Sequence, residues 1–200
     1  MTRLDTLYRQ TPSQTVGPYF AYGLYPEQYN FDLKSLFTAS IADREAVGQH
    51  ISIVGQVFDG EENVVGDAVI EMAQADSTGR YVSTLAEARQ SGFRGFARVG
   101  TGTDPELRYV VDTVKPGSTG DESAPHIDVI VLMRGMLLHA YTRVYFDDEA
   151  QANARDPVLA LVPEARRGTL IARREPGTSN TIYRFDVHLQ GPKETVFFDL

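Results

Sequence analysis

Apolar and polar residues alternate in short runs over most of the chain from His50 onward. In the segment 51–57, residues Ile51, Ile53 and Val57 fall on one face of an extended strand. Asp59-Gly60 then marks a turn, and 67–74 is expected to be the returning strand. The same pattern predicts further short strands at 93–99, 107–114, 127–133, 137–146, 168–172, 181–189 and 194–198. Many short strands separated by turns predict an all-β fold, an antiparallel β-sandwich.

One short helix is predicted, at 147–155. It begins with three acidic residues, Asp147, Asp148 and Glu149, which suit a helix N-terminus because the helix dipole favours negative charge there. Asp156-Pro157 is expected to end it, since the residue before a proline avoids the α-helical region. The predicted fold therefore combines a sandwich with a single short helix.

The first 48 residues have no regular period. They mix turn-forming residues with aromatic ones, namely Pro12, Gly17, Pro18, Gly23 and Pro26 with Tyr19, Phe20, Tyr22, Tyr25 and Tyr29. A solvated polar tail would not carry so many aromatic rings, so the segment packs either onto its own domain or against another chain. We predict an irregular, partner-contacting N-terminal arm at 1–48 and a β-sandwich domain at 49–200.

Composition narrows the class of protein. The chain has 200 residues, a formal net charge of −8 and no cysteine. Disulfides, thiolate metal sites and cysteine nucleophiles are therefore excluded, and a reducing compartment, the cytoplasm, is expected. A negative chain without a Lys/Arg stripe is a poor partner for nucleic acid. The polar first ten residues and the lack of a long apolar run predict neither a secretory signal nor a membrane span.

The residues that could carry chemistry give no motif by themselves. The four histidines are His50, His126, His139 and His188, and no two of them have the short spacing typical of metal ligands. No Gly-x-Ser-x-Gly sequence supports a nucleophile. Spacing alone therefore indicates an all-β domain and no reaction.

Five segments in the right order carry a family resemblance. They are 11–19 (TPSQTVGPY), 55–60 (GQVFDG), 124–127 (APHI), 142–149 (TRVYFDDE) and the ending 183–187 with 194–199. Together they resemble the intradiol ring-cleaving dioxygenases over nearly the whole chain. The ending is similar to the subunit of such enzymes that binds no iron and works beside an iron-bearing β subunit.

The resemblance implies that this chain has lost half of an iron site. Catalytic chains of the family hold Fe(III) with two tyrosines and two histidines, and the positions that match the first of each are Tyr81 and His126. Thr119 stands where the second tyrosine is expected, and Asp128 where the second histidine is expected. An arginine that precedes the histidines is replaced by Ser123. We therefore expect no metal and no catalytic residue on this chain alone, and Fe(III) on its partner.

Two interpretations of these vestigial ligand positions are open. Asp128 and His126 share one face of a strand, so with Tyr81 they could hold a divalent ion weakly. Alternatively, the same residues make hydrogen bonds to one another in a filled pocket, because buried polar groups must be paired.

The resemblance also points to residues that would line the substrate cavity of the partner. These are Thr15, Gly17, Pro18, Tyr19 and Arg134. Arg134 would favour the carboxylate of an anionic substrate. The alternatives are an ordinary turn with a packed aromatic ring for the first group and a solvated or structurally paired arginine for Arg134. Arg143 and the acidic run from Asp147 are expected to serve the fold.

Two rival functions remain. One is a self-sufficient intradiol dioxygenase with an altered metal site, which the iron content of the single chain would reveal. The other is a non-enzymatic β-sandwich used for binding, which a catecholate titration would test.

Overall fold

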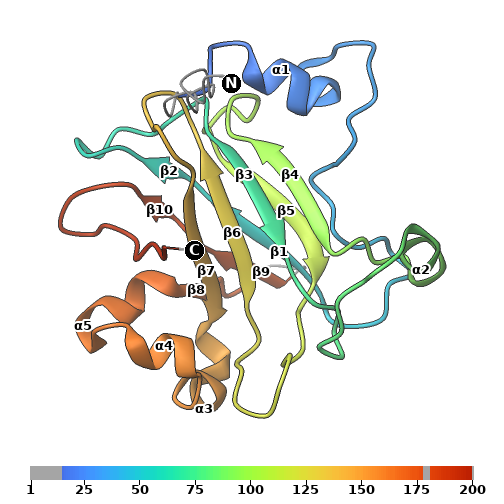
Figure 1. Ribbon diagram of the computed structural model, residues 1–200, viewed down its shortest axis with the longest axis vertical. Coiled ribbons are helices and arrows are strands. Elements are labelled where there is room, and N and C mark those ends of the chain that lie inside the picture. The colour runs from blue at the N-terminus through green and yellow to red at the C-terminus, as the bar shows by residue number, and fades with distance from the viewer. Residues whose placement is uncertain (1–14, 178–180, 200) are drawn as a thin grey trace, which may run out of the picture.

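The computed structural model describes residues 15–177 and 181–199. Eight strands form one continuous sheet in the order β4-β3-β6-β7-β8-β9-β1-β5 (Figure 1). In chain order they are β1 (His50–Gly55), β3 (Val69–Ala73), β4 (Phe96–Gly100), β5 (Tyr109–Val114), β6 (Ile127–Leu132), β7 (Ala140–Phe146), β8 (Ile171–Arg174) and β9 (Thr181–Arg184). A second, two-stranded sheet pairs β2 (Val57–Phe58) with β10 (Val187–His188).

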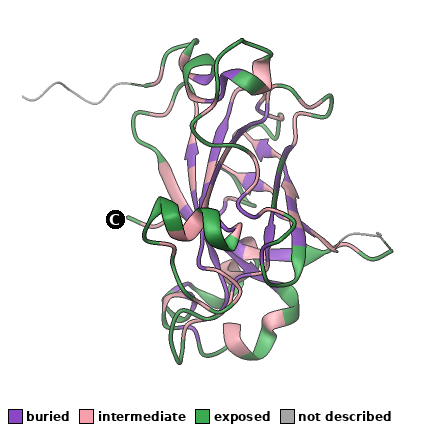
Figure 2. Cartoon of the chain, turned by 90° about the vertical axis from the view of Figure 1, so that its right-hand side faces the viewer, coloured by how far each residue is buried: buried purple, intermediate pink, exposed green. Residues whose placement is uncertain are grey.

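The large sheet folds over into two facing halves, β4-β3-β6-β7 and β8-β9-β1-β5. Side chains of both halves are fully buried between them, among them Ile53, Val111, Val129, Val144 and Tyr183. Figure 2 shows these buried positions gathered along the strands at the centre of the molecule. The predicted all-β fold is confirmed, and so is the apolar face of Ile51, Ile53 and Val57.

The sheet is mixed, whereas the sequence pattern predicted an antiparallel one. β1 pairs with β9 in parallel, as do β7 with β8 and β2 with β10. The antiparallel β8–β9 hairpin is inserted between β7 and β1, and each strand of the hairpin runs parallel to its outer neighbour. Local alternation predicts strands but cannot predict such an insertion, because it carries no information on strand order.

Some predicted strand limits also change. Residues 168–170 form a 3-10 helix, and the predicted strand at 181–189 divides into β9 and β10. The break falls where Asp186 accepts a hydrogen bond from the backbone N–H of Gln56, at 3.0 Å. Residues 194–198 form no strand; they run beside β7, with the N–H of Phe198 donating to the carbonyl of Tyr141 at 2.8 Å.

The N-terminal region closes the seam between the two edge strands, β4 and β5. Residues 38–43 lie between them, and Ile41 bonds to both sides. Its N–H donates to the carbonyl of Asp112 at 2.8 Å, and its carbonyl accepts from the N–H of Arg94 at 2.7 Å. Ile41 is fully buried. Residues before position 49 are thus hydrogen-bonded into the sheet, while the boundary at 48 stays a prediction.

Upstream of the seam, the arm packs partly on the sheet and is partly exposed. It contains α1 (Phe20–Leu24) and a 3-10 helix, η2 (Pro26–Tyr29). Tyr25, only 2% exposed, packs with Val69 over the outside of β3. A side chain at Gly100 would start 2.4 Å from the Tyr25 ring, so only glycine fits there. Exposed rings and aliphatic groups face outward, namely Tyr19, Phe31, Leu33 and Leu36.

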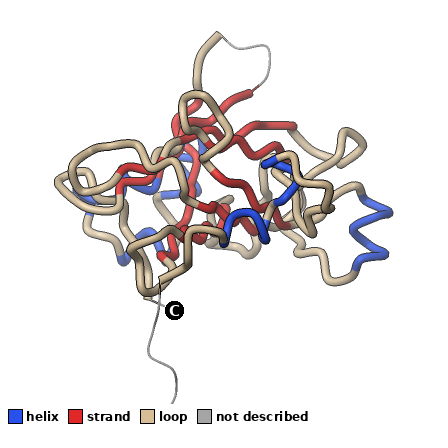
Figure 3. Tube along the Cα trace, turned by 90° about the horizontal axis from the view of Figure 1, so that it is seen from above, coloured by secondary structure: helices blue, strands red, loops and turns tan. Residues whose placement is uncertain are grey.

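More short helices are present than predicted. The helix at 147–155 is confirmed as η3 (Asp147–Glu149) followed by α3 (Ala150–Asn153). Asp156-Pro157 ends it and also begins α4 (Pro157–Leu161), because the Asp156 carboxylate caps the N–H groups of Val158 and Leu159. The others are α2 (Leu85–Ser91), α5 (Glu164–Arg167) and η4 (Gly168–Leu170). All lie outside the strands (Figure 3), and none in the described ranges is long and apolar enough to cross a membrane.

Candidate functional site

Three of the four vestigial ligand positions come together outside β6. His126, just before the strand, is 6% exposed, and its Nδ1–H donates to the carbonyl of Ala124 at 2.8 Å. Its Nε2 lies 4.0 Å from Oδ1 of Asp128. Tyr81 stands close enough to Asp128 for the carboxylate to contribute, after burial, to raising the pKa of its phenol.

Asp128 is neutralised from the neighbouring strand. β6 and β7 place Asp128 directly opposite Arg143, and Nε of Arg143 lies 3.0 Å from Oδ1 of Asp128. The Tyr141 hydroxyl donates to the same carboxylate oxygen. Burial, and then this hydrogen bond, raise the pKa of Tyr141. The carboxylate thus has a cation and a hydroxyl of its own chain as partners.

The fourth vestigial position, Thr119, belongs to a separate hydrogen-bonded turn. Its hydroxyl donates to Ser123 Oγ at 3.1 Å, and no hydrogen bond joins it to Asp128 in the described structure. The turn packs against Gly79, whose φ of +84° and close approach to the Ser118 carbonyl leave no space for a side chain. Thr119 therefore lies against the Tyr81 segment without offering a ligand.

These residues do not fit ferric iron. Among the described residues, no three His, Cys, Asp or Glu side chains are grouped so as to hold a metal ion. The guanidinium of Arg143 occupies the carboxylate of Asp128 and would repel a cation placed there. For Asp128 the contacts favour pairing within the chain over the weak divalent-ion site, whereas Tyr81 is 53% exposed and its hydroxyl bonds to no described residue.

Sequence reasoning missed the residues that hold this cluster. Arg143 and Tyr141 close it, and buried Asp156 supports it by accepting from the Tyr145 hydroxyl at 3.1 Å and the Ala124 N–H at 2.9 Å. A signal for Arg143 existed. A β6–β7 hairpin centred on the turn at Gly135 pairs position 128 with position 143, so an acid and a base of opposite charge face each other.

A second candidate region lies at the β6–β7 turn around Gly135. Arg134 is 55% exposed at the side chain and forms an ion pair through Nε with Asp67. Its two Nη groups have no hydrogen-bond partner among residues 15–177 and 181–199. The N–H of Gly135 donates to Thr15 Oγ1 at 2.8 Å, so the arm is tied to the turn. Beside it is a pocket of about 370 Å³ with Met133, Met136 and Phe197 among its lining residues.

The remaining predicted cavity residues lie on the arm just beyond Thr15. The carbonyl of Gly17 accepts from the N–H of Phe20 at 3.2 Å, which makes an ordinary turn. Pro18 is exposed, and Tyr19 is 77% exposed. Within the described residues, no hydrogen bond joins this turn to Arg134. The structure therefore brings Thr15 to Arg134 and leaves Gly17, Pro18 and Tyr19 on the surface.

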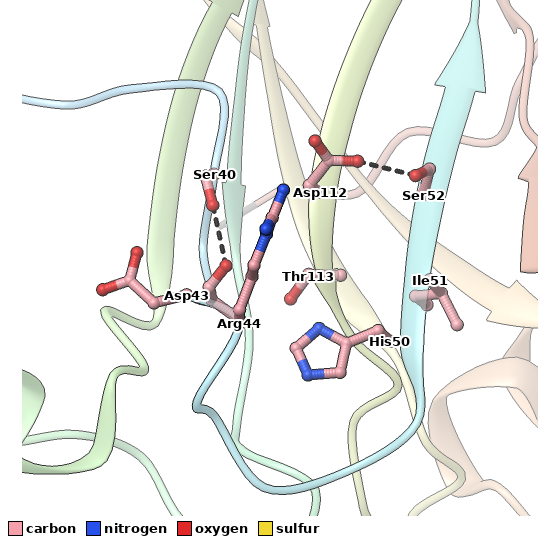
Figure 4. A pocket seen from close by; sticks show the side chains of 9 residues that line it. Ser40, Asp43, Arg44, His50, Ile51, Ser52, Asp112 and Thr113 are labelled. Carbon is pink, nitrogen blue, oxygen red and sulfur yellow. Dashed lines mark hydrogen bonds between the residues drawn. The ribbon is translucent and has the colours of Figure 1, made fainter. Parts of the chain in front are cut away.

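A further cleft, of about 500 Å³, opens between the arm and the β1–β5 pair (Figure 4). Its lining is slightly acidic, because it has one cation, Arg44, and two carboxylates, Asp43 and Asp112. Asp112 accepts from the Ser52 hydroxyl at 2.6 Å. No predicted site residue lies in it.

Comparisons with known proteins agree with the fold and the resemblance. A family model described as "Dioxygenase" matches residues 17–191. The chain is 62% identical to a protocatechuate 3,4-dioxygenase alpha chain from Burkholderia cepacia, over 98% of this chain and 100% of that one. It is 29% identical to the beta chain from the same organism, over 78% and 71%. The dioxygenase domain of a Streptomyces carbohydrate-binding fusion superposes with a TM-score of 0.57 at 21% identity, covering 94% and 100%.

Proposed function

Because the chain belongs to the intradiol dioxygenase family, we propose that it is the α subunit of a protocatechuate 3,4-dioxygenase. Together with an iron-bearing β subunit it would cleave protocatechuate with O2 to 3-carboxy-cis,cis-muconate, a step of aromatic catabolism in the β-ketoadipate pathway. The similarity to both an alpha and a beta chain supports a hetero-oligomer of αβ units. The lack of cysteine fits a reducing cytoplasm.

The Asp128–Arg143 pair is the observation that carries this proposal. At position 128, where the family pattern has an iron-binding histidine, this chain has an aspartate whose carboxylate is paired with the guanidinium of Arg143. Iron bound by the partner would activate the catecholate for reaction with O2. The contribution of this chain is then to bind and orient substrate, because its own ligand positions do not fit the metal.

Arg134 is the residue of this chain best suited to touch substrate. Since Nε is held by Asp67, both Nη groups remain as donors, and an arginine fork binds a carboxylate well. Thr15 fixes the adjoining turn through the N–H of Gly135. Gly17, Pro18 and Tyr19 would complete the cavity wall and exclude water. The exposed apolar side chains of the arm, such as Phe31 and Leu36, would be covered by the partner.

The experiment compares the chain alone with the chain co-expressed with the neighbouring reading frame. The single chain should be colourless, with substoichiometric iron and no O2 uptake on protocatechuate. The co-expressed pair should be coloured by phenolate–Fe(III) charge transfer and active. A coloured, iron-loaded single chain that turns over would instead support a self-sufficient enzyme.

A further inference from the structure

Two arginines face each other on the outside of the β8–β9 hairpin. The antiparallel register pairs Arg173 directly with Arg184. Side chains at directly opposed positions start about 4.5–5.5 Å apart, and like charges there destabilise the sheet. A cross-strand pair of this kind needs a negative partner on each side.

Only one of the two arginines has such a partner among residues 15–177 and 181–199. Arg184 binds the Asp186 carboxylate through Nε at 3.0 and 3.2 Å, and its Nη2 donates to the Gln56 side chain at 2.8 Å. The Arg173 side chain is exposed and makes no ion pair or hydrogen bond with any described residue. One positive charge of the pair is therefore uncompensated.

Both arginines line a pocket of about 450 Å³ that also holds Lys193, His188 and Thr195. Asp186 is the one carboxylate among the described lining residues, and Arg184 already binds it. Lys193 forms an exposed pair with Glu62 at 3.0 Å, which contributes little and is easily exchanged. The cleft of Figure 4, whose lining has two carboxylates and one arginine, shows that an excess of positive charge is not general on this chain.

The hydroxyl of Thr195 adds a neutral donor. It accepts from the N–H of His188 at 3.0 Å, and its own proton has no acceptor among the described residues. His188 stacks on Phe58, with ring centroids 4.7 Å apart, and this holds one wall of the pocket in place. Arg173, Lys193 and the buried Thr195 thus line one space large enough for a small molecule.

We propose that this pocket binds a small, multiply charged oxyanion, with Arg173 and Lys193 as its main partners. The shared chemistry is that of phosphate and of di- or tricarboxylates, whose oxygens accept several charge-assisted hydrogen bonds. In a chain of net charge −8, such an anion would bind because of this local cluster and not because of general attraction. The site is independent of the activity proposed above.

The test is a calorimetric titration of the natively assembled protein with sodium phosphate and, separately, with tricarballylate, at constant ionic strength set by chloride. We expect saturable binding of at least one anion, and the tighter one identifies the class of ligand. Arg173→Gln should weaken binding about 10-fold or more, as loss of a charge-assisted contact does. Arg89→Gln, which removes an equal charge from exposed α2, should leave the dissociation constant within about twofold.

A thermal scan at low salt gives a second readout. Without added anion, Arg173→Gln should melt at or slightly above the wild-type temperature, because it removes one of two opposed like charges. Phosphate or tricarballylate should then raise the melting temperature of wild type more than that of the variant at the same anion concentration. Equal responses in both proteins, or none beyond chloride, would overturn the proposal. So would dissociation of the assembly by Arg173→Gln, which would assign the pocket to an acidic side chain of a partner.

Discussion

The chain carries two arginine–aspartate pairs near the same strand, and they differ in what they leave free. Arg143 and Asp128 face each other within the β6–β7 pair, with side chains 21% and 23% exposed, and Tyr141 completes the contact. Arg134 and Asp67 meet at the turn that follows β6, with side chains 55% and 34% exposed. In the first pair the charges satisfy each other, whereas in the second the Nη groups remain available.

The difference shows how arginine–aspartate pairs can have two outcomes in one subunit. One pair fills the place of a lost metal site, and the other leaves an arginine free to contact substrate. An ion pair enclosed between strands consumes both charges and leaves no open position for a ligand. An ion pair at an exposed turn binds the guanidinium through Nε and leaves the Nη groups free to donate to a ligand. The four predictions below test this contrast, from the largest expected effect to the smallest.

Arg134→Ala in the assembled enzyme should lower kcat/KM for protocatechuate roughly 10- to 150-fold. That range corresponds to loss of a charge-assisted hydrogen bond worth about 1.5–3 kcal/mol. Steady-state O2 uptake measures it, with plain catechol as the matched substrate, whose cleavage should fall much less because it lacks the carboxylate. Equal losses on both substrates would mean that Arg134 supports assembly instead.

Asp128→Ala should lower the free energy of unfolding by about 1–3 kcal/mol, because Arg143 is left largely buried without its counter-ion. Urea denaturation of the variant measures the loss. Asp43→Ala serves as control, since it breaks a more exposed pair with Arg94 and should cost no more than about 1 kcal/mol. If the two variants lose the same stability, the ion pair of Asp128 with Arg143 contributes no more than an exposed pair does.

Asp67→Ala should raise KM for protocatechuate about 2- to 5-fold while kcat stays unchanged. An exposed ion pair is worth about 0.2–1 kcal/mol, so freeing Arg134 disorders its side chain at modest cost. Asp67→Asn retains an acceptor oxygen, so its KM should lie between the KM of wild type and that of Asp67→Ala. A lower KM in Asp67→Ala would show that repulsion between Asp67 and substrate outweighs its hold on Arg134.

The phenols of the closed cluster should resist alkali. Burial first, and then Asp128, raise the pKa of Tyr81 and of Tyr141 above the ordinary value near 10. Asp128→Asn should lower the pKa of both phenols, and a spectrophotometric difference titration of the variant against wild type separates them from the other tyrosines. Their stabilising contribution is complete below about pH 10 and is lost as pH rises through the raised values. A difference titration that shows no change in phenol ionisation between wild type and Asp128→Asn would contradict this.

Sequence alone predicted the strands well because each carries its own alternation, as in Ile51, Ile53 and Val57. It could not predict that β9 would lie beside β1, since that pairing depends on the order of distant segments. The substituted ligands Thr119 and Asp128 could be found from the family pattern. That Arg143 fills the place of a lost cation depends on hairpin register, and that Asp67 holds Arg134 depends on contact between residues 67 positions apart.

The seam made by residues 38–43 has a consequence for how the chain remains soluble and when it can fold. β4 and β5 would otherwise be free edges, each offering unpaired backbone groups to a strand from another molecule. Residues 38–41 cover both edges, because the Thr38 carbonyl accepts from Arg98 in β4 and the Ile41 N–H donates to Asp112 in β5. A fragment that starts at position 49 should therefore aggregate even though it keeps every strand of the large sheet. During synthesis residues 38–43 emerge before β4 and β5, which are made more than fifty residues later. The segment can therefore form its hydrogen bonds only after both strands have been made.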